Sequence, residues 1–115
     1  MSAPTIDLAT FEALKATTGA EFALELLDTF LEEAPAMIGE LHDSLAAKDA
    51  DKFRRAAHSL KSNSNTFGAL TLGAMARDLE LGGLASVAEK GTQPLDALAQ
   101  EYARVAAALT AIRNG

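Results

Sequence analysis

The sequence contains no cysteine. A disulfide framework, a cysteine-ligated metal site and a thiol nucleophile are therefore excluded, and packing alone must stabilise the fold. The chain also lacks any apolar run close to the roughly 18 to 20 residues that a membrane span needs. Its first residues, Met1 to Pro4, show neither the basic nor the apolar region of a signal peptide. We therefore expect a soluble, cytoplasmic protein.

Basic residues are fewer than acidic ones, with 10 Lys and Arg against 16 Asp and Glu and a formal net charge of -6. Nucleic acids and anionic lipids bind basic surfaces. This balance disfavours both as partners and leaves another protein or a small molecule. With 115 residues, of which 49% are hydrophobic, the chain can bury one core. We expect residues 1–115 to form a single domain that is a monomer.

Proline and glycine are also sparse, at 3 and 8 residues. Apolar residues recur at spacings of three and four and seldom alternate with polar ones, which predicts helices throughout. Short connections between long helices favour antiparallel neighbours. We expect an all-α fold, an antiparallel up-and-down four-helix bundle with a short additional N-terminal helix. The first expected helix starts at Asp7 and is stopped by Thr17-Thr18-Gly19. The others run from about Glu21 to about Ala47, from Asp49 or Asp51 to about Phe67, onward from Thr71, and from Pro94 to about Ile112.

Several residues mark the ends and interruptions of these helices. The side chain of Asp7 can cap the first helix, and Pro94 suits the first turn of the last one. Pro35 falls inside the second helix, where it removes a backbone hydrogen bond, so we expect a kink near residues 32–34 or a break into two pieces. The pair Gly82-Gly83 either ends the fourth helix or marks a close backbone approach to a neighbour.

Outside the third helix, the expected core faces consist of large apolar side chains at helical spacing. They are Leu8, Phe11 and Leu14, then Phe22, Leu26, Leu27, Phe30, Leu31, Ile38, Leu41 and Leu45, then Leu72, Met75, Ala76 and Leu79, and finally Leu95, Leu98, Tyr102, Val105, Leu109 and Ile112.

The third helix contains the candidate site. On a helical projection one side of it collects the expected core residues, which are Phe53, Ala56, Ala57, Leu60, Ser64 and Phe67. His58 projects about 140° from the centre of this face at about 100° per residue, so it should face solvent. Arg54, Lys61, Ser62 and Asn65 share its outward sector.

The surroundings of His58 in the sequence are basic. Between Asp51 and Asp78 no residue is acidic, yet five are basic, namely Lys52, Arg54, Arg55, Lys61 and Arg77. An exposed imidazole on a positive patch suits a visiting anion, such as a phosphoryl group and the acidic site that delivers it. A neutral imidazole can attack phosphorus without a base to activate it. Lys61, one turn away, can stabilise the phosphoryl oxygens.

Two segments resemble a known family. Residues 57–68 read AHSLKSNSNTFG. They resemble the signature of histidine-containing phosphotransfer (HPt) domains of bacterial two-component phosphorelays, in which His-x-Leu-Lys-Gly is followed several residues later by Gly. Residues 72–80, LGAMARDLE, resemble the next helix of that family. Together with the expected bundle, the resemblance covers nearly the whole chain.

The resemblance implies a role for each matching residue. His58 would accept a phosphoryl group reversibly from a receiver-domain phosphoaspartate and pass it to another receiver. Lys61 would stabilise the phosphoryl group, and Gly68 would be the structural glycine that ends the active-site helix. Ser62 departs from the family, which usually has glycine at this position. Ser62, Arg54 and Asn65 are possible supporting residues.

The resemblance also implies the partners, which are receiver domains of response regulators or of hybrid histidine kinases. A receiver would dock on apolar residues near Met37 and Ile38 of the second helix, with neighbours in the first. We expect no cofactor, because any Mg²⁺ would belong to the receiver. The chain has no Gly-rich phosphate loop. It would therefore be a phosphoryl carrier without its own ATP site rather than an independent enzyme.

A different hypothesis is a docking adaptor, an HPt-like bundle that binds receivers or other signalling proteins without accepting phosphate. Ser62 favours the adaptor, whereas intact His58 with Lys61 favours the carrier. A di-iron site is disfavoured, because neither His42 nor His58 has a glutamate three residues before it. No serine shows the nucleophile-turn pattern of a hydrolase. His42 is expected to be an ordinary surface residue.

Overall fold

The computed structural model describes residues 5–115, which form five helices. They are α1 (Leu8–Thr18), α2 (Ala20–Ala47), α3 (Ala50–Thr66), α4 (Leu70–Lys90) and α5 (Gln93–Asn114). No strand occurs in this part of the chain, which confirms the all-α prediction. Met1 to Pro4, whose sequence lacks signal-peptide features, lie outside the described range. Among residues 5–115, none of the helices combines the length and the hydropathy that a membrane span requires.

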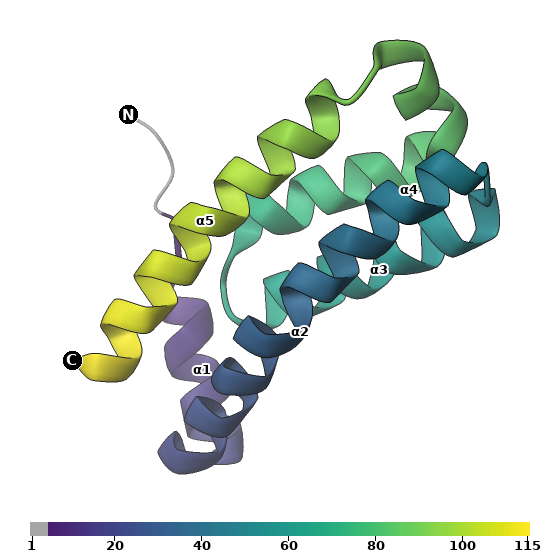
Figure 1. The fold of residues 1–115 in the computed structure, drawn as a ribbon. Coiled ribbons are helices and arrows are strands. Elements are labelled where there is room, and N and C mark those ends of the chain that lie inside the picture. The colour runs from purple at the N-terminus through teal and green to yellow at the C-terminus, as the bar shows by residue number, and fades with distance from the viewer. Residues whose placement is uncertain (1–4) are drawn as a thin grey trace.

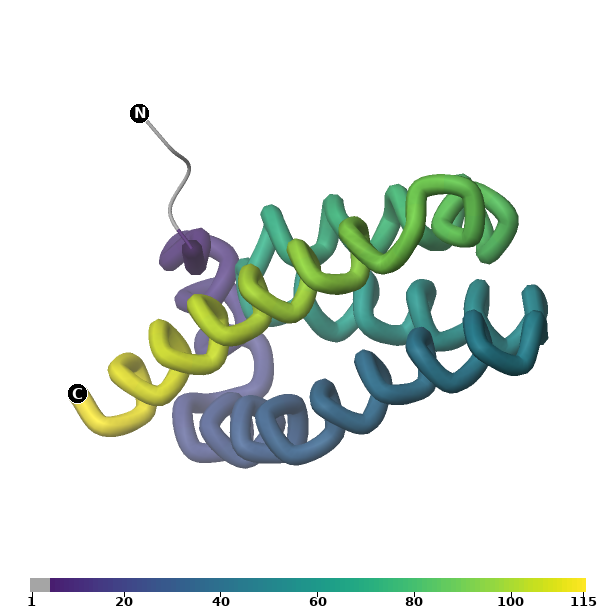
Figure 2. Tube along the Cα trace, turned by 45° about the horizontal axis from the view of Figure 1, so that its top comes forward, coloured from purple at the N-terminus to yellow at the C-terminus, as the bar shows by residue number. Residues whose placement is uncertain are grey.

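The four longer helices lie alongside one another, and α1 lies across one end of them, as Figure 1 and Figure 2 show. Helix α3 packs between α2 and α4, and α5 packs against α4 and α2. Helix α1 contacts α2 and α3. The helix with the candidate histidine is therefore held by packed neighbours on two sides.

Buried leucine, phenylalanine and valine side chains from all five helices form the core. Those that are almost inaccessible to solvent are Phe11, Leu27, Leu41, Phe53, Leu60, Leu72, Leu95, Leu98, Val105 and Leu109. Two expected core residues are exceptions, because Leu8 is 60% exposed and Phe22 is 51% exposed. Both lie in the first turn of a helix at the edge of the molecule. Ile6, which precedes α1, and Ala23 of α2 are buried there instead.

The N-termini of the helices differ in how they are capped. Asp49 caps α3, because its carboxylate accepts a hydrogen bond from the Lys52 backbone N–H at 3.1 Å. Pro94 lies in the first turn of α5, as expected. The predicted side-chain cap at Asp7 is wrong, because that carboxylate accepts a hydrogen bond from the Thr10 hydroxyl instead. Asp7 contributes to the fold through its backbone.

Gly68 joins the end of α3 to the chain before α1. Its carbonyl accepts a hydrogen bond from the Asp7 N–H at 2.7 Å, and its φ of 83° is in the left-handed region that favours glycine. A Cβ at this position would lie 2.5 Å from the Asp7 carbonyl oxygen. The turn after α3 therefore needs glycine for its backbone conformation and for the close approach of Asp7.

Gly83 interrupts α4. Its φ of 73° and ψ of -178° are not helical, so the chain changes direction before Leu84. A Cβ on Gly83 would have no neighbour within 4 Å, which argues against a close backbone approach at this glycine. At Gly83 the structure therefore supports an end to the first part of the helix. Gly82 is more crowded, because a Cβ there would lie 3.1 Å from the Ser86 Cβ.

Pro35 does not break α2, which is continuous from Ala20 to Ala47. The predicted alternative of two separate pieces is therefore wrong, although the tube in Figure 2 changes direction partway along this helix. Proline has no N–H, so the Leu31 carbonyl lacks the donor that a helix normally supplies four residues later. The Tyr102 hydroxyl of α5 donates to this carbonyl at 3.4 Å. A phenol is protonated at neutral pH, so the Tyr102 hydroxyl is available as a donor. Burial raises the pKa of Tyr102 further.

We expect Tyr102→Phe to lower the free energy of unfolding by about 0.5–1.5 kcal/mol, because it removes the donor to the Leu31 carbonyl. Chemical denaturation measures this difference. In a Pro35→Ala background the restored N–H can bond Leu31, so the same change should cost less. An equal cost in both backgrounds would show that the tyrosine does not compensate for the proline.

We expect Gly68→Ala to destabilise the fold by more than about 1 kcal/mol, because alanine is strained at positive φ and its methyl group would meet the Asp7 carbonyl. Gly91→Ala is the matched control, since Gly91 also has a φ of 83° but would place its Cβ in open space. Thermal or chemical denaturation compares the two variants. If both variants lost the same free energy of unfolding, the close contact between Gly68 and Asp7 would not contribute to stability.

Candidate functional site

The core face of α3 is buried as the projection predicts. Phe53, Ala57 and Leu60 are fully buried, whereas the His58 side chain is 56% exposed. The prediction that His58 faces solvent is confirmed. Helix α3 is capped by Asp49 and packed between α2 and α4, so the backbone that carries His58 is held in place. His42 is also exposed, as expected.

Glu80 of α4 binds the imidazole of His58. The His58 Nδ1 lies 2.7 Å from Glu80 Oε2, within hydrogen-bond distance. An ionised carboxylate can only accept hydrogen bonds, so Nδ1 must carry the proton that is shared with Glu80. In the neutral ring the lone pair then lies on Nε2. The contact thus selects the tautomer whose nucleophilic nitrogen is Nε2.

Lys61 binds the same carboxylate. Its Nζ lies 2.8 Å from Glu80 Oε1, so the two oxygens of Glu80 are occupied by two different partners. Hydrogen bonds from Lys61 and then from His58 hold the pKa of Glu80 below its usual range, and together they outweigh the opposing effect of burial. Glu80 therefore stays ionised when pH falls into the ordinary glutamate range. On the acid side, the charged interactions of Glu80 are lost as pH falls through its lowered pKa.

The other predicted supporting residues do not join this cluster. Arg54 forms an ion pair with Asp51 at 3.0 Å. Ser62 is exposed, one turn after His58, and its carbonyl accepts a hydrogen bond from the Thr66 hydroxyl. The Asn65 side chain lies so close to Gly73 of α4 that a Cβ there would overlap it. The structure thus groups His58 and Lys61 with Glu80.

Sequence reasoning did not assign a role to Glu80, although a signal for it exists. His58 lies 11 residues before Ala69 and Glu80 lies 11 residues after it. Asn65 and Gly73, which also meet, each lie four residues from Ala69. Residues placed symmetrically about a tight turn face each other in an antiparallel helix pair. A search for partners of His58 at mirrored positions would have found Glu80.

The basic residues of α3 are partly neutralised in the structure. Arg54 and Arg55 share the carboxylate of Asp51, at 3.0 and 3.1 Å, and Lys61 pairs with Glu80. Lys52 forms no ion pair within residues 5–115. The patch predicted from the sequence is therefore less positive than its count of basic residues suggests.

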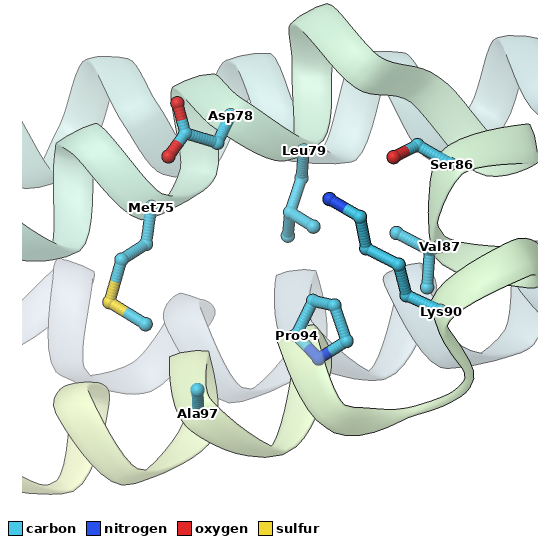
Figure 3. Close-up of a pocket in the computed structure, with 8 residues that line it drawn as sticks. All are labelled: Met75, Asp78, Leu79, Ser86, Val87, Lys90, Pro94 and Ala97. Carbon is cyan, nitrogen blue, oxygen red and sulfur yellow. The ribbon is translucent and has the colours of Figure 1, made fainter.

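A separate cleft lies between α4 and α5, with a volume of about 210 Å³. Its lining includes Met75, Asp78, Leu79, Ser86, Val87, Lys90, Pro94 and Ala97. Figure 3 shows Lys90 extending into this cleft towards Leu79, with the Asp78 carboxylate turned away from it. None of its lining residues belongs to the His58 cluster. The described residues also contain no group of three or more His, Cys, Asp and Glu arranged for a metal ion.

Comparison with known proteins relates this geometry to a family. Residues 25–115 match the Hpt domain. The chain is also similar to the crystal structure of histidine-containing phosphotransfer protein B (HptB) from Pseudomonas aeruginosa PAO1, with a TM-score of 0.87 and 28% sequence identity, over 98% of this chain and 97% of that chain. No curated protein matches the sequence. Because the match spans most of the chain and includes all of α3 and α4, the protein belongs to the Hpt domain family and functions in histidine phosphotransfer within a phosphorelay.

Proposed function

We propose that His58 is the residue that carries the phosphoryl group, receiving it from the phosphoaspartate of one receiver domain and passing it to the aspartate of another. The observation that supports this assignment is the hydrogen bond between His58 Nδ1 and Glu80, which leaves Nε2 free on an exposed ring. His42 is also exposed, but within residues 5–115 its ring forms no side-chain hydrogen bond or ion pair comparable to that of His58. Because, in the part of the chain that the structure describes, only the His58 ring has a carboxylate that fixes its tautomer, we favour His58 over His42 as the phosphorylated residue.

The transfer follows from this geometry. The Nε2 lone pair attacks the phosphorus in line as the bond between phosphorus and the aspartyl oxygen breaks, and that electron pair returns to the aspartate carboxylate. The ring becomes positively charged while Nδ1 keeps its proton. Glu80 stabilises this charge through the hydrogen bond at 2.7 Å. The reverse sequence delivers the group to a second receiver.

Lys61 has two alternative partners during this cycle. In the structure its ammonium binds Glu80, 2.8 Å away. Once a phosphoryl group is on Nε2, its oxygens offer a second anion one helical turn from the lysine. Lys61 can then stabilise the phosphoryl group, and Glu80 keeps its bond to Nδ1. We assign to Ser62, Arg54 and Asn65 no direct part in this step.

We also infer the setting in which the chain works. The chain acts as a phosphoryl carrier without its own ATP site, and Mg²⁺ belongs to the receiver. Residues 1–115 form a single domain in which α2 to α5 make an antiparallel up-and-down bundle, and it works as a cytoplasmic monomer. The mirrored pairs about Ala69 support the antiparallel arrangement for α3 and α4.

We expect wild-type protein to incorporate acid-labile, alkali-stable phosphate from phosphorylated receiver domains, and His58→Gln to incorporate none. Glutamine removes the nucleophilic nitrogen but fits on an exposed helix surface. His42→Gln is the matched control and should label normally. Equal labelling of wild type and His58→Gln would disprove the assignment. Binding of receivers without any labelling of the wild type would support the docking adaptor.

We expect Glu80→Ala to slow phosphoryl transfer to His58 by on the order of tenfold, because the charge that develops on the ring loses its hydrogen-bonded carboxylate. The ¹⁵N chemical shifts of the imidazole should also show a larger fraction of the tautomer protonated at Nε2. Glu89→Ala, an exposed glutamate of the same helix, is the control. Unchanged ¹⁵N shifts in Glu80→Ala would rule out its role in tautomer selection.

A further inference from the structure

A groove between α2 and α3 opens beside His58. Its volume is about 310 Å³, and its lining is formed by Met37, Glu40, Lys52, Arg55, Ala56 and Ser59. Ser59 follows His58 in the chain, and Arg55 lies one turn before it. One helical turn is about 5.4 Å along the axis. Two of its lining residues therefore lie within one helical turn of the residue that a phosphoryl donor must approach.

The polar side chains of this groove are mostly cationic or neutral donors. Lys52 has no ion pair within residues 5–115. Arg55 is 69% exposed, and its Nε lies 3.1 Å from Asp51 Oδ2. Ser59 adds a hydroxyl on the same wall, and Glu40 supplies the one carboxylate in the lining. The unpaired Lys52, the partly paired Arg55 and the Ser59 hydroxyl together still favour an anionic occupant over the one carboxylate in the lining.

The lower part of the groove is apolar. Met37 is partly buried and packs against the core, and Ala56 is 3% exposed. An occupant with methylene groups below a terminal negative charge would match both parts of the lining. A glutamate or aspartate side chain has this chemistry.

The acidic side chain that fits the groove should belong to a protein, because the phosphoryl donor at His58 is itself a protein. The aspartate that exchanges the phosphoryl group must reach bonding distance of Nε2, and a specific protein interface buries about 800 Å² on each partner. A surface of that size extends well beyond one imidazole. Any receiver seated over His58 therefore also covers the mouth of a groove that begins within one turn of it.

We propose that this groove accepts an acidic side chain of the receiver domain, with its carboxylate between Lys52 and Arg55 and its methylene groups against Met37 and Ala56. This inference rests on the proposed function and names a contact that selects the partner. Glu40 on the facing wall repels a second acidic residue, so the groove discriminates among receivers by the position of one negative charge.

The test compares two double variants in the full chain. Lys52→Glu/Arg55→Glu reverses the charge of the groove. Lys90→Glu/Arg113→Glu makes the same change in net charge on α4 and α5, and Arg113, like Arg55, gives up one exposed ion pair with an aspartate. Each protein is labelled with a phosphorylated receiver and, separately, with phosphoramidate, a small phosphodonor that needs no docking. Circular dichroism checks that both variants keep their helix content.

We expect the groove variant to lose roughly tenfold or more in kcat/KM with the receiver, beyond any change in its phosphoramidate rate, and the control variant to match wild type. A receiver in which one surface Asp or Glu is replaced by Lys should restore transfer to the groove variant. Equal losses in both double variants, or no receiver-specific loss, would overturn the inference. If neither donor labelled the wild-type protein, that result would contradict the proposed function itself and, with it, the contact proposed for the groove.

Discussion

The site depends on the register between α3 and α4, which the tight turn at Gly68 and Ala69 establishes. That register places Glu80 opposite His58 and Gly73 opposite Asn65. A slide of either helix by one turn would move Glu80 about 5.4 Å along its axis, out of reach of the imidazole. The hydrogen bond from the Asp7 N–H to the Gly68 carbonyl joins this turn to the chain before α1. The short N-terminal helix is therefore connected directly to the turn that fixes the register of the site.

Much of the fold could be predicted from the sequence because each helix has a strong local signal. The apolar face of α3 decides the exposure of His58, and Asp49 and Pro94 mark helix starts through their own chemistry. Local signals fail at the edges of the molecule. Leu8 and Phe22 are spaced like core residues, yet no neighbouring helix covers their end of the bundle enough to bury them. The sequence predicts an interruption at Pro35 because the replacement donor, the Tyr102 hydroxyl, lies 71 residues from the Leu31 carbonyl that it bonds, so no local pattern reveals it.

The site was predictable to the extent that it lies on one helix. His58 and Lys61 are one turn apart on α3, so a projection and a family resemblance identify both. Glu80 is on another helix, and only a helix pair with a known turn brings it to the imidazole. Arg54 and Asn65 share the outward sector of His58, but each has another partner nearby, Asp51 for one and the surface over Gly73 for the other. Projection shows which way a residue faces and does not show which neighbour binds it.

The proline inside α2 has a consequence for the position of α5. Along most of a helix every carbonyl is hydrogen-bonded within its own backbone, so it offers a neighbouring helix no free polar acceptor. The Leu31 carbonyl is an exception on α2, and Tyr102 is the only tyrosine in the chain. A displaced α5 would leave a partly buried acceptor unpaired. Pro35, a residue type usually regarded as a helix breaker, thereby helps to fix the position of α5 along α2.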